Sequence, residues 1–401
     1  IAPPHSTAGD TIRWHWDIPF VVSHYDHERL YALGSRLLRS DNRGDGWEVL
    51  TDDLSRQIDR DTLSIMGRVW PDDAVWKHVF TNDYGIGVAF SESRLDPNLL
   101  YVGTDDGLIQ VSEDAGTSWR KIDAFPGIPS LIYVSDVVAS RHDADRVYAL
   151  FNNHKRGDFT PYAMRSDDRG KSWTSIASNL PARHVTWVLE EDPVREDLLF
   201  MGTEFGLFFT LDGGGDWSEL RGGTPTIPFR DIEIQERDGD LVVATFGRGF
   251  YVLDDYTPLR GLTAEVLADD ATLFEPRPVP ASDNIRYYLP GSGSAEYSAE
   301  NPEFGSLLTY YLRESVPESE ILVVIRDAAG DVVAEIPAVN TAGLSRVAWD
   351  LRARRPDGEG SQRGPRAIVE AGAYTATLEA YADGSATPLT QAVPVHVTQP
   401  R

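Results

Sequence analysis

An eight-residue pattern, Ser-x-Asp-x-Gly-x-x-Trp, recurs through the first half of the chain and restricts the folds that this sequence can adopt. Full copies run from Ser112 to Trp119 and from Ser166 to Trp173, and a copy that starts with Thr runs from Thr210 to Trp217. A fourth copy, from Ser40 to Trp47, has Asn42 in place of the Asp. Repetition at this spacing is typical of folds built from copies of one structural unit.

Each shared position of the pattern has a physical use in a tight turn between two strands. An Asp or Asn side chain accepts hydrogen bonds from backbone amides of its own turn. Gly adopts the positive φ that such a turn needs, and Trp buries apolar area between neighbouring sheets. We therefore expect each copy to close a β-hairpin, and these four segments are called repeat turns below.

The strands around the repeat turns also recur. An apolar strand, a glycine-containing turn and a second strand come before each repeat turn, a further strand lies upstream, and a fifth copy at 241–253 has no repeat turn after it. Four short antiparallel strands, named A to D from the inside outward, make up a propeller blade. We predict an all-β chain with five blades, whose inner strands lie near 15–22, 84–91, 132–139, 185–190 and 229–234.

Two segments interrupt or follow this pattern. An insertion from about Ser55 to His78 is predicted to form a lid-like loop. After residue 259 the repeats stop, and short alternating strands separated by turn residues indicate an immunoglobulin- or fibronectin-like sandwich. The predicted domains are a propeller over 1–259, a linker over 260–282 and a β-sandwich over 283–401.

The composition excludes several classes of function. The net charge is −26, with four lysines against 33 arginines, which disfavours nucleic acids and anionic membrane surfaces. An acidic, lysine-poor chain fits a salt-adapted bacterium or a high-GC genome, and the sequence leaves both open. The chain contains no run of 18 apolar residues and no cysteine, so it encodes no membrane-spanning helix and no disulfide.

The repeat turns, with the phrases at 102–107, 202–206, 247–255 and 347–351, resemble the BNR/Asp-box superfamily. This superfamily includes sialidases, xyloglucan-cleaving glycoside hydrolases and the propeller of sortilin-type receptors. The chain is similar in particular to bacterial sortilin-like, glycosyl-hydrolase-type propeller proteins. The resemblance implies an extracellular or periplasmic location. Because members usually have more blades upstream, it also favours five blades that are part of a larger propeller, with a complete five-bladed ring as the alternative. A partner chain that carries the missing N-terminal blades is a further hypothesis.

Strand direction predicts which loops share a face of the propeller. The D–A and B–C connections share one face, called the top face here, and the A–B turns share the bottom face with the repeat turns. The repeat turns are therefore interpreted as structural. The top face is predicted to collect Trp14, His15, Trp16, Asp17, Arg36, Asp83, Tyr84, Asp105, Asp106, Tyr133, Asn152, Asn153, His154, His184, Glu204, Arg230 and Arg248.

This mixture of side chains suits a sugar site. Aromatic rings stack on sugars, carboxylates do acid–base work and arginines bind anionic groups. The catalytic candidates are Asp17, Asp83, Asp105 and Glu204. The candidates for ligand binding are Trp14, Trp16, Tyr84, Tyr133, Arg230 and Arg248. A sialidase-type site would need three arginines, and those present lack the matching motif contexts.

The sequence predicts no metal and no cofactor. His24 and His27 flank a bottom turn while His15 lies at the top, so roughly 25–30 Å of strand separates them. Neither a glycine-rich phosphate loop nor a nucleophile elbow occurs. Two main functions stay open: a binding or assembly module for a protein or glycan ligand, and a glycoside hydrolase that acts on an extracellular polysaccharide. A purely structural module is a third possibility.

Overall fold

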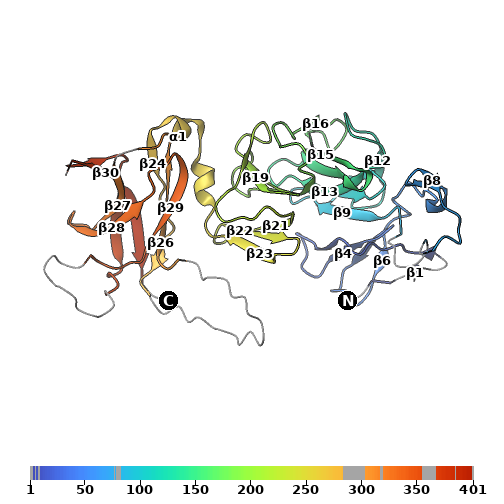
Figure 1. Ribbon diagram of the computed structural model, residues 1–401. Coiled ribbons are helices and arrows are strands. Elements are labelled where there is room, and N and C mark those ends of the chain that lie inside the picture. The colour runs from blue at the N-terminus through green and yellow to red at the C-terminus, as the bar shows by residue number, and fades with distance from the viewer. Residues whose placement is uncertain are drawn as a thin grey trace. The chain divides into compact units, whose positions relative to one another are not determined.

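The computed structural model describes residues 3–4, 6–7, 10–75, 77, 83–282, 303–316, 319–354, 367–383 and 385–399. The chain divides into two compact units, one made of Ile1–Arg237 and Leu241–Val252 and the other of Asp238–Asp240 and Leu253–Arg401. Both are built of β-sheets (Figure 1). No helix in these ranges is long and apolar enough to cross a membrane.

The first unit contains five successive antiparallel sheets in which strands pair with their neighbours along the chain. They run from blue to yellow in Figure 1. The first four sheets, blades 1 to 4, have four strands each. Blade 1 consists of β3 (Phe20–Val22), β4 (Leu30–Leu33), β5 (Leu37–Ser40) and β6 (Glu48–Val49), and blade 2 of β9 (Gly87–Glu92), β10 (Leu100–Thr104), β11 (Ile109–Ser112) and β12 (Arg120–Ile122). Blade 3 consists of β13 (Tyr133–Ala139), β14 (Val147–Asn153), β15 (Asp158–Ser166) and β16 (Thr174–Ser175), and blade 4 of β17 (Thr186–Glu191), β18 (Leu199–Thr203), β19 (Leu207–Thr210) and β20 (Trp217–Glu219).

The fifth sheet has three strands, as expected for a blade that lacks a repeat turn. They are β21 (Phe229–Gln235), β22 (Asp240–Thr245) and β23 (Phe250–Leu253). The inner strands of all five sheets line one cavity of about 230 Å³, to which they contribute Val21, Phe90, Val137, Leu189 and Ile232. Sheets placed around a central cavity in this way form a β-propeller, so the predicted fold class is confirmed. The first inner strand is shorter than predicted, because β3 begins at Phe20.

Apolar side chains fill the space between adjacent blades. The second strand of each of the first four blades is almost entirely buried. One cluster joins blades 2 and 3 and contains Tyr101, Val134, Phe151 and Trp173. Similar clusters join blade 1 to blade 2 and blade 3 to blade 4. Burial of apolar surface therefore positions the blades relative to one another.

The repeat turn of blade 3 shows how these segments are stabilised. The Ser166 Oγ donates to the Asp168 carboxylate at 2.8 Å and accepts the Gly170 N–H at 2.7 Å. The Asp168 carboxylate also accepts the backbone and hydroxyl hydrogens of Ser172. Gly170 has a φ of 78°, and its carbonyl accepts the Nε1–H of the buried Trp173. The Ser or Thr hydroxyl accepts the same glycine amide in the other three turns, at Gly44, Gly116 and Gly214.

Every repeat turn is also bonded to the A–B turn of its own blade. In each case the residue before the central glycine donates its backbone N–H to an A–B carbonyl. The pairs are Arg43 to Glu28 at 2.8 Å, Ala115 to Asn98 at 2.9 Å, Arg169 to Asp145 at 2.7 Å and Gly213 to Asp197 at 2.9 Å. Repeat turns and A–B turns therefore share the bottom face, and their polar groups are occupied in locking these turns.

Two buried glutamates tie neighbouring blades together. Glu191 at the end of β17 accepts hydrogen bonds from the Ser140 and Tyr148 hydroxyls of blade 3, each at 3.0 Å, and from the Arg141 N–H. Glu92 at the end of β9 accepts equivalent bonds from the Ser23 hydroxyl, the His24 N–H and the Tyr31 hydroxyl of blade 1. These ties were not predicted from the sequence.

The predicted insertion contains η1 (Arg60–Thr62) and a small hairpin of β7 (Ser64–Ile65) and β8 (Arg68–Val69). Its predicted end, His78, lies outside the described residues. A further short hairpin near the start of the chain pairs β1 (Ser6–Thr7) with β2 (Asp10–Thr11).

The second unit consists of two sheets that enclose one apolar core containing Tyr310, Trp349 and Leu378. One sheet has the order β24 (Ala271–Leu273), β26 (Ser306–Leu312), β29 (Gly343–Trp349). The other has the order β25 (Val279–Pro280), β32 (Val393–Thr398), β30 (Gly372–Ala382), β27 (Glu320–Arg326), β28 (Val332–Ala338), with β31 (Ser385–Pro388) beside β30. Two sheets on one core form a β-sandwich.

The segment at 260–282 differs from the predicted linker. After η3 (Thr257–Gly261) come the helix α1 (Ala264–Ala268) and then β24 and β25, which pair with β26 and β32. Ala271 and Leu273 alternate along β24 and pack into the core of the sandwich, so this segment is an edge of that unit. The first residues of the predicted sandwich, 283–302, lie outside the described residues.

A candidate ligand-binding site on the top face

Backbone hydrogen bonds bring the B–C turns and the D–A connections together. In blade 2, the Asp105 N–H donates to the Ile86 carbonyl at 3.0 Å. In blade 4, the Glu204 N–H donates to the Val185 carbonyl at 2.9 Å, and an equivalent bond forms in blade 5. The loops that were expected to share the top face therefore lie together.

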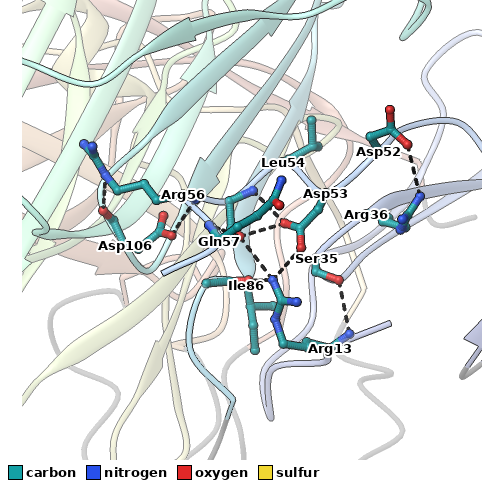
Figure 2. Close-up of polar contacts among 12 residues, drawn as sticks. Arg13, Ser35, Arg36, Asp52, Asp53, Leu54, Arg56, Gln57, Ile86 and Asp106 are labelled. Atoms are coloured by element: carbon teal, nitrogen blue, oxygen red, sulfur yellow. Dashed lines mark hydrogen bonds and ion pairs between the residues drawn. The ribbon is translucent and has the colours of Figure 1, made fainter. Parts of the chain in front are cut away.

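Charged side chains fix the connection between blades 1 and 2 (Figure 2). The Arg13 guanidinium donates to the Asp53 carboxylate at 2.7 Å and to the Gly85 carbonyl at 2.8 Å. The Arg56 N–H donates to the Asp106 carboxylate at 2.7 Å, and the Arg56 side chain donates to the Asp106 carbonyl. These contacts hold the start of the insertion against the chain that enters β9.

A pocket of about 410 Å³ opens beside this connection. Four of the predicted site residues, Asp83, Tyr84, Asp105 and Tyr133, line it. The other lining residues are His15, Arg60, Leu63, Ser64, Ile65, Met66, Leu131, Asn152, Asn153, Lys155 and Arg156. The pocket therefore combines carboxylates, aromatic rings, amides and cations, the groups that orient a polar ligand.

The two carboxylic acids of the pocket have different surroundings. Asp105 is partly buried, and one of its oxygens accepts the Gly85 and Ile86 N–H groups at 3.0 and 2.8 Å. Burial raises the pKa of Asp105 to about 7, although these two hydrogen bonds oppose the shift. Asp83, two residues before Gly85, is exposed. At neutral pH the pocket therefore contains one carboxyl group that is poised to hold or release a proton.

Aromatic groups form the floor between blades 2 and 3. Burial raises the pKa of Tyr84 to about 12, and it also raises the pKa of Tyr133. The ring centroids of Tyr133 and His15 lie 6.2 Å apart, and the Lys155 ammonium lies 5.5 Å from the Tyr133 centroid. Both phenols therefore stay protonated and can donate hydrogen bonds.

The insertion forms one wall of the pocket through Leu63, Ile65 and Met66. Met66 is at the hairpin tip with a φ of 54°, and 95% of its side chain is exposed. The insertion also lines a second cavity of about 550 Å³, which contains Trp70 and shares Arg60, Leu63 and Ile65 with the pocket. The wall therefore combines apolar side chains with the polar Arg60 and Ser64.

A second group of site residues surrounds Trp187 on blades 4 and 5. The Trp187 Nε1–H donates to the Glu204 carboxylate at 2.9 Å. The Arg230 guanidinium carbon lies 3.4 Å from the Trp187 ring centroid and 5.5 Å from that of Phe246. The Trp187 indole therefore contacts both residues: it donates a hydrogen bond to Glu204 and stacks against the guanidinium of Arg230.

The remaining candidates lie apart from the pocket. Asp17 is exposed and its N–H donates to the His15 ring, while 87% of Trp16 is exposed. Trp14 is half-buried near Gly34, and Arg248 is exposed in the turn between β22 and β23. None of these four lines the pocket. Among the described residues, no group of three or more His, Asp or Glu side chains is placed to hold a metal ion.

The sequence did not identify Trp187, Lys155 or Arg156. The pairing of β17 with β18 shifts between Thr186 and Val188, so Trp187 is the extra residue of a bulge at the top end of the inner strand. A bulge of this kind re-aims a side chain. The only signal in the sequence was a tryptophan where the other inner strands have smaller residues, Val88 and Ser135.

No protein-family model matches the chain, and no curated protein matches it. Among solved structures, the chain is similar to an ancestral GH74 enzyme, with 11% identity, a TM-score of 0.43 and coverage of 96% of this chain and 48% of that one. The chain therefore spans about half of that enzyme. For the GH74 xyloglucanase from Xanthomonas campestris, the identity is 14%, the TM-score 0.45 and the coverage 93% and 70%. For YCF48 bound to D1 peptide, these values are 16%, 0.35, 61% and 68%.

Proposed function

We propose that the propeller unit is a binding module that holds a glycan on its top face. The observation that supports this proposal is the pocket of about 410 Å³, in which Asp83, Tyr84, Asp105 and Tyr133 face one space. Hydroxyl-rich sugars need several hydrogen-bonding groups together with an aromatic surface. The pocket provides both, and the apolar insertion borders it.

The test is direct binding of oligosaccharides to the whole chain, measured by a glycan array and then by calorimetry. We expect Tyr133→Ala to weaken binding of a responsive glycan by about tenfold, because it removes an aromatic wall. Tyr25→Ala is the matched control, since Tyr25 is 44% exposed in an A–B turn of the bottom face. Equal affinities of the two variants would contradict the placement of the site.

Glycoside hydrolysis is the second candidate, and the unlike environments of Asp105 and Asp83 favour it. A hydrolase uses a protonated acid beside the glycosidic oxygen and an ionised carboxylate as base or nucleophile. Asp105, with its raised pKa, suits the first role, and the exposed Asp83 suits the second. We expect Asp105→Asn to lower kcat by about 100-fold or more while binding persists. A wild-type chain that binds a glycan without cleaving it would exclude hydrolysis of that glycan.

We also propose that the chain belongs with the Asp-box propellers of the sortilin-like kind and works in the extracellular space or periplasm. The four repeat turns, with their shared hydroxyl-to-glycine bonds, support this membership. Structural polysaccharides of cell walls and matrices are found outside the cytoplasm, which fits the location. Fractionation of a bacterium that expresses the full protein tests it. Recovery in the cytoplasmic fraction alone would contradict it.

Assembly with a partner chain that carries further blades is supported by the outer faces of the first and last blades. On β3, Phe20 and Val22 are 43% and 51% exposed, and on β23, Phe250 and Val252 are 76% and 55% exposed. Another blade would cover such apolar faces. Native mass spectrometry should detect a mass above the 44.5 kDa of this chain. A mass of one chain at every concentration would contradict assembly.

A further inference from the structure

Arginines on the bottom face of the propeller are neutralised by nearby carboxylates. Arg43 pairs with Glu28 at 3.0 Å, and Arg169 pairs with Asp145 at 2.7 Å. Arg146 pairs in the same way with Asp167. In a chain with a net charge of −26, acidic side chains are abundant, so an arginine without a carboxylate partner needs a reason.

Several cations in the top-face connections differ from this pattern. Within the described part of the propeller unit, none of them has a carboxylate oxygen within 4.0 Å. They are Arg68 in the insertion hairpin, Lys155 and Arg156 in the B–C connection of blade 3, Arg183 before β17, Arg230 at the start of β21 and Arg248 in the B–C turn of blade 5. All six side chains are exposed. The described top-face connections therefore contain several cations that form no ion pair.

Arg230 is held in place by two aromatic rings, Trp187 and Phe246. Its planar face lies on Trp187, and the hydrogen bond from Trp187 to Glu204 fixes the orientation of the indole. No described residue accepts a hydrogen bond from its guanidinium. Partial burial lowers the pKa of Arg230, although the nearby Glu204 and Asp17 carboxylates oppose the shift. An anion at the edge of the guanidinium would compensate for the lost solvation through paired, charge-assisted hydrogen bonds.

We propose that the glycan held on the top face is anionic, and that Arg230 binds one of its acid groups, a carboxylate or a sulfate. This inference rests on the proposed function and narrows it to acidic sugars. The exposed Asp83 carboxylate would repel an acid group next to it in the pocket. We therefore place the acid group beside Arg230, on the side of blades 4 and 5, and the uncharged sugar ring in the pocket between blades 2 and 3.

The test compares the affinities of three heptasaccharides for the whole chain. They are a galacturonate heptamer, a neutral glucose heptamer and a sulfated glucose heptamer. We expect an acidic heptamer to bind about tenfold or more tightly than the neutral one. The preference should shrink as NaCl rises from about 50 to about 500 mM, because salt screens exposed charges. The two acidic probes distinguish carboxylate from sulfate recognition.

Arg230→Gln should remove the preference for acidic heptamers, so that acidic and neutral heptamers bind with affinities within about twofold of each other. Arg230→Lys should restore the preference only in part, because a lysine keeps the charge but loses the paired hydrogen bonds. Arg43→Gln is the matched control on the bottom face and should change neither affinity. Neutral and acidic heptamers that bind equally, or an Arg230→Gln variant that keeps the preference, would overturn the inference while glycan binding stands.

A separate measurement covers the case in which no heptamer binds. The Nε–Hε signal of Arg230 is followed by NMR during titration with sodium sulfate and sodium galacturonate. Saturable shifts that disappear in Trp187→Leu would support an anion site at Arg230 and would reject the proposal that its ligand is a glycan. An unresponsive signal would overturn the anion site itself.

Discussion

Asp105 and Asp168 are carboxylic acids of one propeller whose surroundings move their pKa values in opposite directions. Asp105 is desolvated in the top-face pocket, which raises its pKa to about 7. Asp168 is in a repeat turn, where hydrogen bonds from Ser172 and Ser166 lower its pKa to about 2. The sequence predicted a catalytic role for Asp105 and a structural role for the repeat turn that contains Asp168. It could not predict the two pKa values, because burial and hydrogen bonding depend on the fold.

The first prediction concerns the titration of these two side chains. An NMR titration of carboxyl carbons should give a midpoint of about 7 for Asp105 and about 2 for Asp168. The Asp105 signal is assigned with Asp105→Asn, and the Asp168 signal with Asp168→Asn. A midpoint for Asp105 in the ordinary range of aspartates, near about 4, would show that the pocket does not desolvate it.

At the scale of the elements, the repeat turns depend on a small hydroxyl. Ser166 is 1% exposed and accepts the N–H of the buried Gly170 while it donates to Asp168. Removing this hydroxyl leaves a buried donor without a partner, which costs more than the loss of an exposed hydrogen bond. The hydroxyl therefore contributes more to the stability of the turn than its size suggests.

We predict that Ser166→Ala lowers the free energy of unfolding of the propeller by about 1–3 kcal/mol. Ser172→Ala is the control, because its hydroxyl also binds Asp168 but is exposed. Urea unfolding followed by the fluorescence of the nearby Trp173 measures both. Equal losses in the two variants would mean that burial of the hydroxyl is unimportant.

The glutamate ties between blades give a second prediction at this scale. Glu191 is fully buried and accepts three hydrogen bonds from blade 3. Glu191→Gln places an amide donor among these donors, and we expect it to destabilise the propeller by about 2–3 kcal/mol. Glu196→Gln, at an exposed site of the next turn, is the control. Chemical denaturation that finds both variants as stable as the wild type would refute the tie.

Much of the element scale was predictable from sequence. The glycines and tryptophans of the repeat turns act locally, so four repeat turns and five blades follow from their spacing. Apolar alternation indicated a sandwich after residue 283 but missed β24 and β25. The bulge at Trp187 arises from a register shift between β17 and β18. The hydrogen bond between Glu191 and Tyr148 joins segments more than 40 residues apart. The sequence pattern does not encode such relations. The segment at 260–282 was predicted to be a linker because it contains Pro276, Pro278 and Pro280, and because β24, with three residues, is too short to show a clear alternation.

At the scale of the whole molecule, the inner strands bring several acids to the central cavity. Burial raises the pKa of Asp136 and of Glu190 to about 7 each. Burial also raises the pKa values of Asp231 and Glu233, which line the same cavity. Arg141 pairs with Glu190 and partly offsets this effect. Blades 3, 4 and 5 thus bring together one group of acids whose pKa values are raised by burial.

These shifts predict how stability depends on pH. A raised pKa in the folded state means that the folded protein binds more protons than the unfolded chain between about pH 4 and 7. The free energy of unfolding should therefore fall as the pH rises from about 5 to 8. The lowered pKa values of His15, His24 and His154 oppose this only below their usual value of 6.5.

Thermal unfolding of the wild type and of Asp136→Asn across this pH range tests the prediction. The variant should show a flatter pH dependence, because one of the titrating groups is gone. Glu265→Gln in the second unit is the control and should leave the slope unchanged. A wild-type stability that rises steadily from pH 5 to 8 would contradict the shifts.

The glutamate ties also bear on how such a propeller can change its blade number during evolution. Glu92 joins blade 2 to blade 1 and Glu191 joins blade 4 to blade 3, whereas the equivalent positions in blades 3 and 5 are Ala139 and Gln235. Each buried glutamate therefore depends on hydroxyl groups that the preceding blade supplies. A blade inserted at either junction would have to present a serine and a tyrosine at the same places, or leave a buried carboxylate without donors.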